Sequence, residues 1–389
     1  MTSVEDVPYP RFPPDEYAER WRAIDGLRAA SGLDALVVYG TGAARHELTW
    51  LTAWGPRQEG YLVAGGDRPP ALFVQLFNHV PTARLMSVVE RVEWGGTDSA
   101  ATVARDLEDR GVRHRVGLVG AIPYRQQARL SAALDGVELV DATAEFRRLR
   151  LVKSAREIEW TRRGAALCDA AMRTLVAEAR PGMTEHELGA LVEAAYGRLG
   201  GSHGICFIAT APMGGGGRFV PSQHWSSRRI EAGDLILIEL SAGIGGYTGQ
   251  ILRTIVVGAE PTDDVRRLHD VAAAAFDAIA AAVRPGALTA DLLAAAELID
   301  RAGLTVCDDV VHGYGGGYLP PVLRTPATMH GSVPDLVLEP GMMVVVQPNV
   351  VTPDEMLGVQ TGELLLVGPD GAETMHHFER GLLVAGGGA

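Results

Sequence analysis

A short internal repeat reads Arg180-Pro181-Gly182-Met183-Thr184 and, further along the chain, Arg284-Pro285-Gly286-Ala287-Leu288-Thr289. Each copy follows an Ala-rich, helix-like stretch that ends at Pro-Gly, and each contains a threonine that can cap the next helix. Strand-rich sequence comes after each unit. Two pairs of helices that each lead into antiparallel strands predict an α+β domain with pseudo-twofold symmetry. We expect a functional site where its two halves meet.

The boundary of this domain falls near Ser154, which begins a Ser-Ala-Arg-Glu capping box in which Glu157 can bond back to the cap amide. Apolar residues then recur at helical spacing as far as Arg180, which predicts one long helix. Residues 1–150 instead alternate helix and strand patterns and predict an α/β domain. The expected domains are therefore 1–150 and 151–389. Within the first, we expect helices at 15–31 and 99–111 and strands at 35–39, 61–63, 71–74 and 116–119.

Composition narrows the class of protein. The 389 residues are 47% hydrophobic and 21% charged, which is ordinary for a globular protein and rules out wholesale disorder. With 35 Lys and Arg against 48 Asp and Glu, the net charge is -13, which argues against a nucleic-acid partner. There are three cysteines without a Cys-x-x-Cys pattern, no apolar run that could span a membrane, and no signal-peptide pattern. We therefore expect a cytoplasmic protein with no membrane partner.

Several motifs share their order and spacing with one known family. The stretches Gly233-Asp234-Leu235-Ile236-Leu237-Ile238-Glu239-Leu240 and His312-Gly313-Tyr314-Gly315 resemble ligand strands of the metallopeptidases that include prolidase, aminopeptidase P and methionine aminopeptidase. Creatinase is a member of this pita-bread family that is not a peptidase. The resemblance implies a creatinase/prolidase-like N-terminal domain, a pita-bread C-terminal domain and a homodimer with shared active sites. The matching stretches are residues 33–38, 48–52, 233–240, 246–254, 312–315, 340–348 and 358–367.

The resemblance also implies a pair of divalent ions held by two Asp, one His and two Glu. At those positions this chain has a different set of residues, namely Glu239, Gln250, His312, Gln347 and Gly362. Amides carry no charge and glycine has no side chain, while two hard cations need several carboxylates to offset the loss of their hydration. We therefore expect no metal and no other cofactor. The alternative is a single, weakly held ion at Glu239 and His312.

Three residues are candidates for catalysis. Glu239 stands in an apolar predicted strand, where burial would raise its pKa and suit it to act as a base or a covalent nucleophile; the alternative is a structural acid paired with Arg253. His312 can act as a base or orient one, and the alternative is a satisfied core histidine. His224 resembles the proton-transfer histidine of creatinase. It lies closer to Glu239 than the family spacing, so Ser222 is the alternative occupant of that place.

Five further residues are candidates for contacts with a substrate. Gln250 and Gln347 would stand where the family holds its metals, and an amide can donate and accept hydrogen bonds at once. The alternative is a vestigial pocket in which the two amides only satisfy each other. Tyr247 and Glu363 are predicted to line the wall. Arg57 resembles the creatinase arginine that clamps a substrate carboxylate in the partner subunit, and the alternative is a solvated loop residue.

These residues predict a metal-independent hydrolase that cleaves a C–N bond of amide, amidine or ureido type in a small polar metabolite. Creatinase and ectoine hydrolase are the family members that the chain resembles in this respect. Creatine itself is not expected, because Leu252 and Gly362 stand where creatinase has acids. The alternatives are a lyase or isomerase on the same scaffold, a non-catalytic binding module, and an Xaa-Pro peptidase with an altered metal site.

Overall fold

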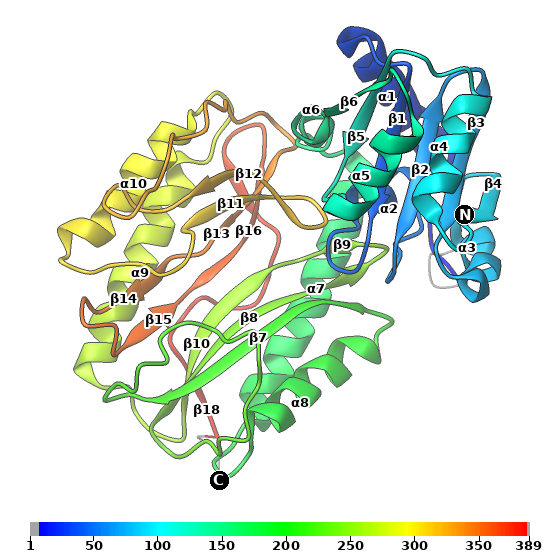
Figure 1. The fold of residues 1–389 in the computed structure, drawn as a ribbon. Coiled ribbons are helices and arrows are strands. Elements are labelled where there is room, and N and C mark those ends of the chain that lie inside the picture. Colours follow the sequence, from blue (N-terminus) through cyan, green and yellow to red (C-terminus); the bar gives the residue numbers. More distant parts are fainter. Residues whose placement is uncertain (1–7, 387–389) are drawn as a thin grey trace. The chain divides into compact units, whose positions relative to one another are not determined.

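The computed structural model describes residues 8–386, and its contacts divide the chain into one unit that ends at Arg150 and another that begins at Leu151 (Figure 1). Each unit has a sheet and hydrophobic cores of its own. Among the residues described, no helix combines the length and the apolar character needed to cross a membrane.

The N-terminal unit is a mixed six-stranded sheet with helices on both faces. Its elements are α1 (Pro14–Ser31), β1 (Ala35–Gly40), α2 (His46–Thr52), β2 (Gly60–Gly65), β3 (Arg68–Val74), η2 (Phe77–His79), α3 (Val80–Met86), β4 (Arg91–Trp94), α4 (Ser99–Asp109), β5 (Arg115–Val119), α5 (Tyr124–Ala133), β6 (Glu138–Asp141) and α6 (Thr143–Arg148). The strand order is β4-β3-β2-β1-β5-β6, in which β1 pairs antiparallel with β2 and parallel with β5. Every helix and strand expected for this part of the chain is present, with ends shifted by a few residues at most.

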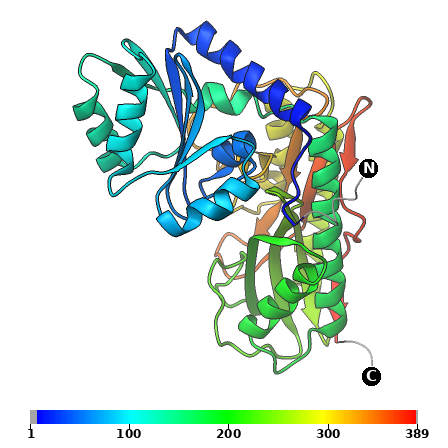
Figure 2. The same cartoon turned by 90° about the vertical axis from the view of Figure 1, so that its right-hand side faces the viewer.

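The C-terminal unit is built on a larger sheet with the path β12-β11-β13-β16-β10-β8-β7. Its helices are α7 (Ala155–Glu178), α8 (Glu185–Gly197), α9 (Asp263–Ala282) and α10 (Thr289–Arg301). Its strands are β7 (Ser202–Pro212), β8 (Asp234–Ile244), β9 (Tyr247–Thr248), β10 (Ile251–Val257), β11 (Val311–Tyr314), β12 (Tyr318–Leu323), β13 (Met343–Val346), β14 (Asn349–Val351), β15 (Gly358–Gln360), β16 (Gly362–Val367), β17 (Ala372–Thr374) and β18 (Leu383–Ala385). Figure 2 shows the long helix α7, in green, running beside these strands.

The two copies of the sequence repeat form matching turns in the two halves of this unit. Thr184 caps α8 as expected, whereas Leu288 rather than Thr289 stands at the N-cap of α10. In the first half, the Gly182 amide donates to the Ile230 carbonyl, ahead of β8. In the second half, the Gly286 amide donates to the Leu338 carbonyl, ahead of β13. Both glycines have a positive φ, of 92° and 80°, which favours glycine at the turn. The predicted pseudo-twofold α+β arrangement is therefore confirmed.

The capping box predicted at Ser154 is also present. The Ser154 hydroxyl accepts from the Glu157 amide at 3.2 Å, and a Glu157 carboxylate oxygen accepts from the Ser154 amide at 2.9 Å. Such reciprocal bonds satisfy amides that an α-helix cannot pair internally. They fix the start of α7 and hence the entry into the C-terminal unit.

Strand periodicity decides which side chains face away from the helices. Ile238 and Leu240 of β8 pack into the core under α7 and α8, so Glu239 points to the opposite face of the sheet. Val311 of β11 packs into the core under α9 and α10, which places His312 on the opposite face as well. The face of the sheet away from the helices therefore carries the ionisable residues from both halves.

Candidate active site

A hydrogen-bonded cluster of four buried side chains lies on this sheet. Gln250, directly before β10, donates from Nε2 to Oε1 of Glu239 at 2.7 Å and to Oε1 of Gln347 at 3.2 Å. The same nitrogen lies 3.4 Å from Nε2 of His312. Glu239 is 6% exposed, Gln250 is 1% exposed, and the other two are fully buried. The structure thus brings together four residues that the sequence singled out from distant segments.

Burial and neighbouring charges raise the pKa of the Glu239 carboxyl to about 8. Loss of solvation is the largest cause, and the charge of Asp308 is the next. The hydrogen bond from Gln250 acts in the opposite direction, because it stabilises the carboxylate. The result is a carboxyl group that gains and loses its proton near neutral pH.

His312 is held in its neutral form, because burial lowers its pKa to about 4. Its Nδ1 lies 3.1 Å from the carbonyl oxygen of Gly313, so we assign the ring hydrogen to Nδ1. Nε2, which faces Gln250, is then a hydrogen-bond acceptor. When Glu239 is ionised, the Gln250 amide has two hydrogens for three surrounding acceptors.

Three residues near this cluster were missed by the sequence analysis. The ring of Tyr318, at the start of β12, stacks on His312 with centroids 3.8 Å apart and planes 12° from parallel. Asp308 and Asp309 precede β11, and both of their charges raise the pKa of Glu239. The sequence could have indicated Asp308 and Asp309, because they form an Asp-Asp pair shortly before the predicted strand that carries His312. Tyr318 directly follows the glycine-rich loop that joins β11 to β12, and only the tertiary fold shows its stacking.

Several buried polar atoms of the C-terminal unit have no hydrogen-bond partner within the described residues. Gln347 leaves its Nε2 unpaired, and Gln360 of β15 leaves both polar atoms of its amide unpaired. The Thr361 hydroxyl shares this property. A buried donor or acceptor without a partner costs about 1–3 kcal/mol, so these groups are suited to bind a polar ligand or water.

Tyr247 and Glu363 are engaged in contacts away from the cluster. The Tyr247 hydroxyl donates to Oε1 of Glu157 at 2.7 Å. Glu363 forms a buried ion pair with Arg253 at 2.7 Å and accepts from the Thr374 hydroxyl at 2.7 Å. Arg253 therefore has Glu363 rather than Glu239 as its ion-pair partner. The substrate contacts predicted for Tyr247 and Glu363 stay predictions.

His224 and Arg57 are both exposed. His224 lies in the loop between β7 and β8, where its backbone exchanges hydrogen bonds with the Ser222 hydroxyl. Within residues 8–386 no hydrogen bond joins the His224 ring to the cluster. Arg57 lies between α2 and β2 of the N-terminal unit. The roles predicted for both residues stay predictions.

The residues at the family's metal positions do not fit a pair of divalent ions. They offer one carboxylate, one imidazole and two amides, and the amide nitrogen of Gln250 rather than an oxygen faces the other three. At the fifth position, a Cβ on Gly362 would lie 2.5 Å from the Val346 carbonyl oxygen, so a side chain has no room there. Across the described part of the chain, no group of three or more His, Cys, Asp or Glu is arranged to hold a metal ion.

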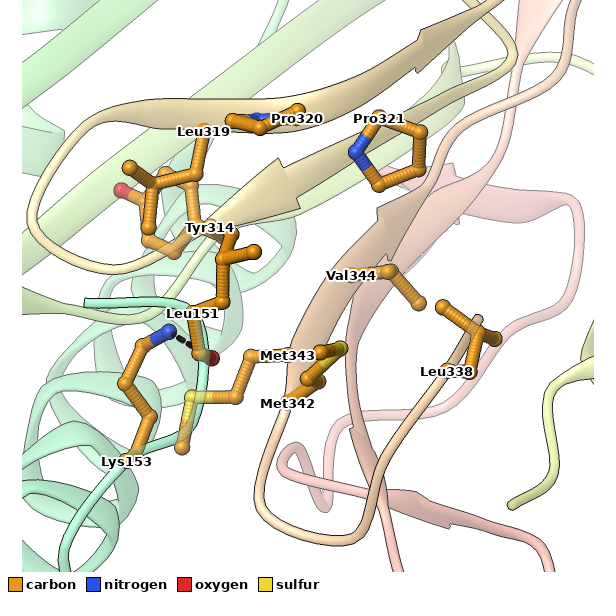
Figure 3. Close-up of a pocket in the computed structure, with 10 residues that line it drawn as sticks. All are labelled: Leu151, Lys153, Tyr314, Leu319, Pro320, Pro321, Leu338, Met342, Met343 and Val344. Atoms are coloured by element: carbon orange, nitrogen blue, oxygen red, sulfur yellow. Dashed lines mark hydrogen bonds between the residues drawn. The ribbon is translucent and has the colours of Figure 1, made fainter. Parts of the chain in front are cut away.

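Another hollow of this unit is apolar and lacks the members of the cluster. It is lined by residues that include Leu319, Pro320 and Met343 (Figure 3). Its one charged group is Lys153, whose Nζ donates to the Leu151 carbonyl at 2.6 Å. Its ionisable side chains are Lys153 and Tyr314, and its lining has no carboxyl or imidazole group, so the candidate site is the cluster around Gln250.

Two regions of the chain match known domain families. Residues 20–152 match the Creatinase/Prolidase N-terminal domain, and residues 159–369 match Metallopeptidase family M24. The chain belongs to Metallopeptidase family M24. It is similar to an uncharacterized peptidase, YqhT, of Bacillus subtilis, at 28% identity over 364 residues, which cover 91% of this chain and 96% of that protein. It is also 25% identical to an Xaa-Pro dipeptidase of Pyrococcus furiosus, with 86% of this chain and 92% of that protein covered.

Solved structures of a prolidase and a dipeptidase share the fold. The prolidase from Pyrococcus horikoshii OT3 superposes with a TM-score of 0.79 at 22% identity and covers 94% of this chain and 100% of that one. The dipeptidase PepE from Mycobacterium ulcerans gives a TM-score of 0.78 at 24% identity, with 96% and 99% covered. The predicted creatinase-type N-terminal domain and pita-bread C-terminal domain are confirmed. Membership of M24 also makes the chain a member of a hydrolase family.

Proposed function

We propose that this M24 member is a metal-independent hydrolase that cleaves a C–N bond in a small polar metabolite, with Glu239 as its proton-transfer group. The observation that carries the proposal is the buried Glu239 carboxyl, held by Gln250 and with a pKa of about 8. A group with a pKa near the working pH can both take up and return a proton within one cycle.

Each side chain of the cluster has a role in the proposed reaction. The Glu239 carboxylate takes a proton from a water molecule whose oxygen bonds to the substrate carbon. The C–N bond then breaks as the protonated Glu239 returns that proton to the leaving nitrogen. The unpaired Nε2 of Gln347 donates to the substrate oxygen on which negative charge develops, and such oriented donors favour the transition state. His312, neutral and covered by Tyr318, places its Nε2 3.4 Å from the Gln250 amide nitrogen and helps to keep that amide turned toward Glu239.

This assignment leaves His224 without a required step. The histidine was predicted to transfer the proton, but it is exposed and the described contacts do not join it to Glu239. A His224→Ala variant that keeps its turnover supports Glu239 as the proton carrier. Loss of turnover in a variant that still folds would instead support His224 as the proton-transfer residue.

The test is a screen of small amides, amidines and ureido compounds, followed by the Glu239→Gln variant on any substrate found. We expect turnover to be lost while the fold is kept, because the amide cannot accept the proton. Mass analysis must show products whose masses together exceed that of the substrate by one water; products without that gain indicate a lyase or isomerase. Single turnover in heavy-oxygen water labels the Glu239 carboxyl only if that group acts as a covalent nucleophile.

A peptidase reaction is the second candidate, because one relative is named an Xaa-Pro dipeptidase and peptide hydrolysis also breaks a C–N bond. The residues at the family's metal positions, which include two neutral amides and a glycine, argue against the metal-assisted form of that reaction. Hydrolysis of Xaa-Pro dipeptides that requires added manganese or cobalt would favour this candidate. Absence of turnover on every compound, together with a stoichiometric protein partner in a pull-down, would favour a binding module.

A further inference from the structure

A hollow of the N-terminal unit lies between α1, the turn from β2 to β3 and the residues that precede β4. Its volume is about 530 Å³, which falls within the range of about 300–1,000 Å³ that is typical of small-molecule sites. All of its lining residues belong to the N-terminal unit, so none comes from the cluster around Gln250. A ligand of this hollow would therefore bind outside the candidate active site.

Part of the lining is apolar. Trp21 of α1 packs against the core of the N-terminal unit and also lines the hollow. Pro69 and Pro70 of β3, together with Val88 and Val89 ahead of β4, add further apolar surface. Such walls are suited to the apolar side chain of a ligand, because the contact removes apolar surface from water on both sides.

The guanidinium group of Arg28, which also lines the hollow, is fixed by its neighbours. Its Nη1 donates to Oδ1 of Asp25 at 2.9 Å, and its Nη2 donates to the Asp34 carbonyl oxygen at 2.7 Å. The group lies against Gly65, where a Cβ would be 2.6 Å from the Arg28 Cζ atom. Each Nη atom carries a second hydrogen, for which the described residues provide no acceptor. A charged donor that is already fixed can bind a carboxylate with little loss of side-chain freedom.

One carboxylate of the lining has no counter-ion. The charged residues around the hollow are Asp25, Arg28, Arg68 and Glu90. Asp25 pairs with Arg28, and Arg68 pairs with Asp109 at 3.1 Å. Glu90 is exposed and forms no ion pair within residues 8–386. The lining therefore combines a charged donor for a carboxylate with a free negative charge for a cation.

We propose that this hollow binds a small zwitterion with an apolar side chain, namely a free apolar amino acid. The ligand carboxylate accepts from Arg28, the ammonium group lies beside Glu90, and the side chain packs against Trp21 and the two prolines. The face of the indole ring also attracts the ammonium group. The inference does not rest on the proposed hydrolysis, because it uses no residue of the cluster around Gln250.

Titration calorimetry on the full chain tests the inference with L-phenylalanine and three related probes. 3-Phenylpropionate lacks the ammonium group, phenethylamine lacks the carboxylate, and glycine lacks the apolar side chain. We expect L-phenylalanine to bind at least about tenfold more tightly than 3-phenylpropionate or phenethylamine, because each of these loses a hydrogen bond between charged groups. Glycine should also bind at least about tenfold more weakly, because it has no side chain to bury.

Two variants locate the binding. Glu90→Gln keeps the shape of the side chain and should lower the affinity for L-phenylalanine about tenfold, without changing that for 3-phenylpropionate. Arg28→Met should weaken the binding of both carboxylates and leave that of phenethylamine unchanged. The matched control is Glu145→Gln, at an exposed position of the same unit, which should alter none of the affinities. Thermal unfolding shows whether each variant folds.

Three outcomes would overturn the inference. The first is the absence of measurable L-phenylalanine binding, and the second is equal affinity for L-phenylalanine and 3-phenylpropionate. The third is binding that Glu239→Gln abolishes and Glu90→Gln leaves unchanged, because the ligand would then occupy the cluster around Gln250. Binding that depends on Glu90, in a protein that hydrolyses nothing, would leave this site standing without the proposed function.

Discussion

Replacing Glu239 by glutamine should make the protein more stable as well as inactive. The substitution keeps an oxygen that can accept from Gln250 at the position now held 2.7 Å away. It removes a group that must be neutral to be buried without cost. Because the pKa of Glu239 is raised from 4.5 to about 8, its contribution favours the folded state at low pH and is lost as the pH rises through that window.

The ionisation of His312 limits the pH range in which the effect of Glu239 on stability can be measured. Burial lowers its pKa from 6.5 to about 4, so its contribution is present above pH 6.5 and is lost as the pH falls. Between pH 6.5 and pH 8, the free energy of unfolding therefore changes with the ionisation of Glu239 and not with that of His312. At about 1.4 kcal/mol for each pH unit, the stability advantage of Glu239→Gln over the natural protein should grow by about 2 kcal/mol across this range.

Urea unfolding at the two ends of this pH range measures the advantage directly. The matched control is Glu339→Gln, an exposed glutamate in the same unit, for which the difference from the natural protein should not change with pH. An advantage of Glu239→Gln that is the same at both pH values would refute the account, because Glu239 would then titrate outside the range.

Three other predictions concern the same sheet. For any substrate found, kcat/KM should rise with pH and level off above about pH 8, because Glu239 acts as a base only when ionised; a rate that falls over this range contradicts that role. Arg253→Met should cost about 3–5 kcal/mol of unfolding free energy, because it leaves the buried Glu363 without a cation, and adding Glu363→Gln should restore part of that stability. Gly362→Ala should cost about 1–3 kcal/mol, because its Cβ would lie 2.5 Å from the Val346 carbonyl oxygen, and unchanged thermal unfolding would show that the strand can yield.

Local signals in the sequence were sufficient for most of the fold. The Pro-Gly repeat and the Ser154 capping box act over a few residues, and their consequences are seen in the paired turns at Gly182 and Gly286. The elements that were not predicted, such as α3, β4 and β6, are short. Short elements carry too few apolar positions to define a period, so their place is set by the rest of the sheet.

The candidate site was predicted where its residues come from strands and missed where it depends on side-chain partners. Alternation along β8 and β11 is enough to turn Glu239 and His312 away from the helices. No spacing in the sequence shows that the Tyr247 hydroxyl bonds to Glu157, which lies 90 positions away in the chain. The stacking of Tyr318 on His312 likewise depends on how β12 returns beside β11.

Metal content is the most direct test of the central claim that side chains alone perform the chemistry. The protein should be purified after growth with manganese, cobalt and zinc, and its bound metal measured by elemental analysis. The account predicts less than one equivalent per chain and turnover that survives chelation. Two equivalents per chain, with turnover lost on chelation and restored by adding the metal, would contradict it.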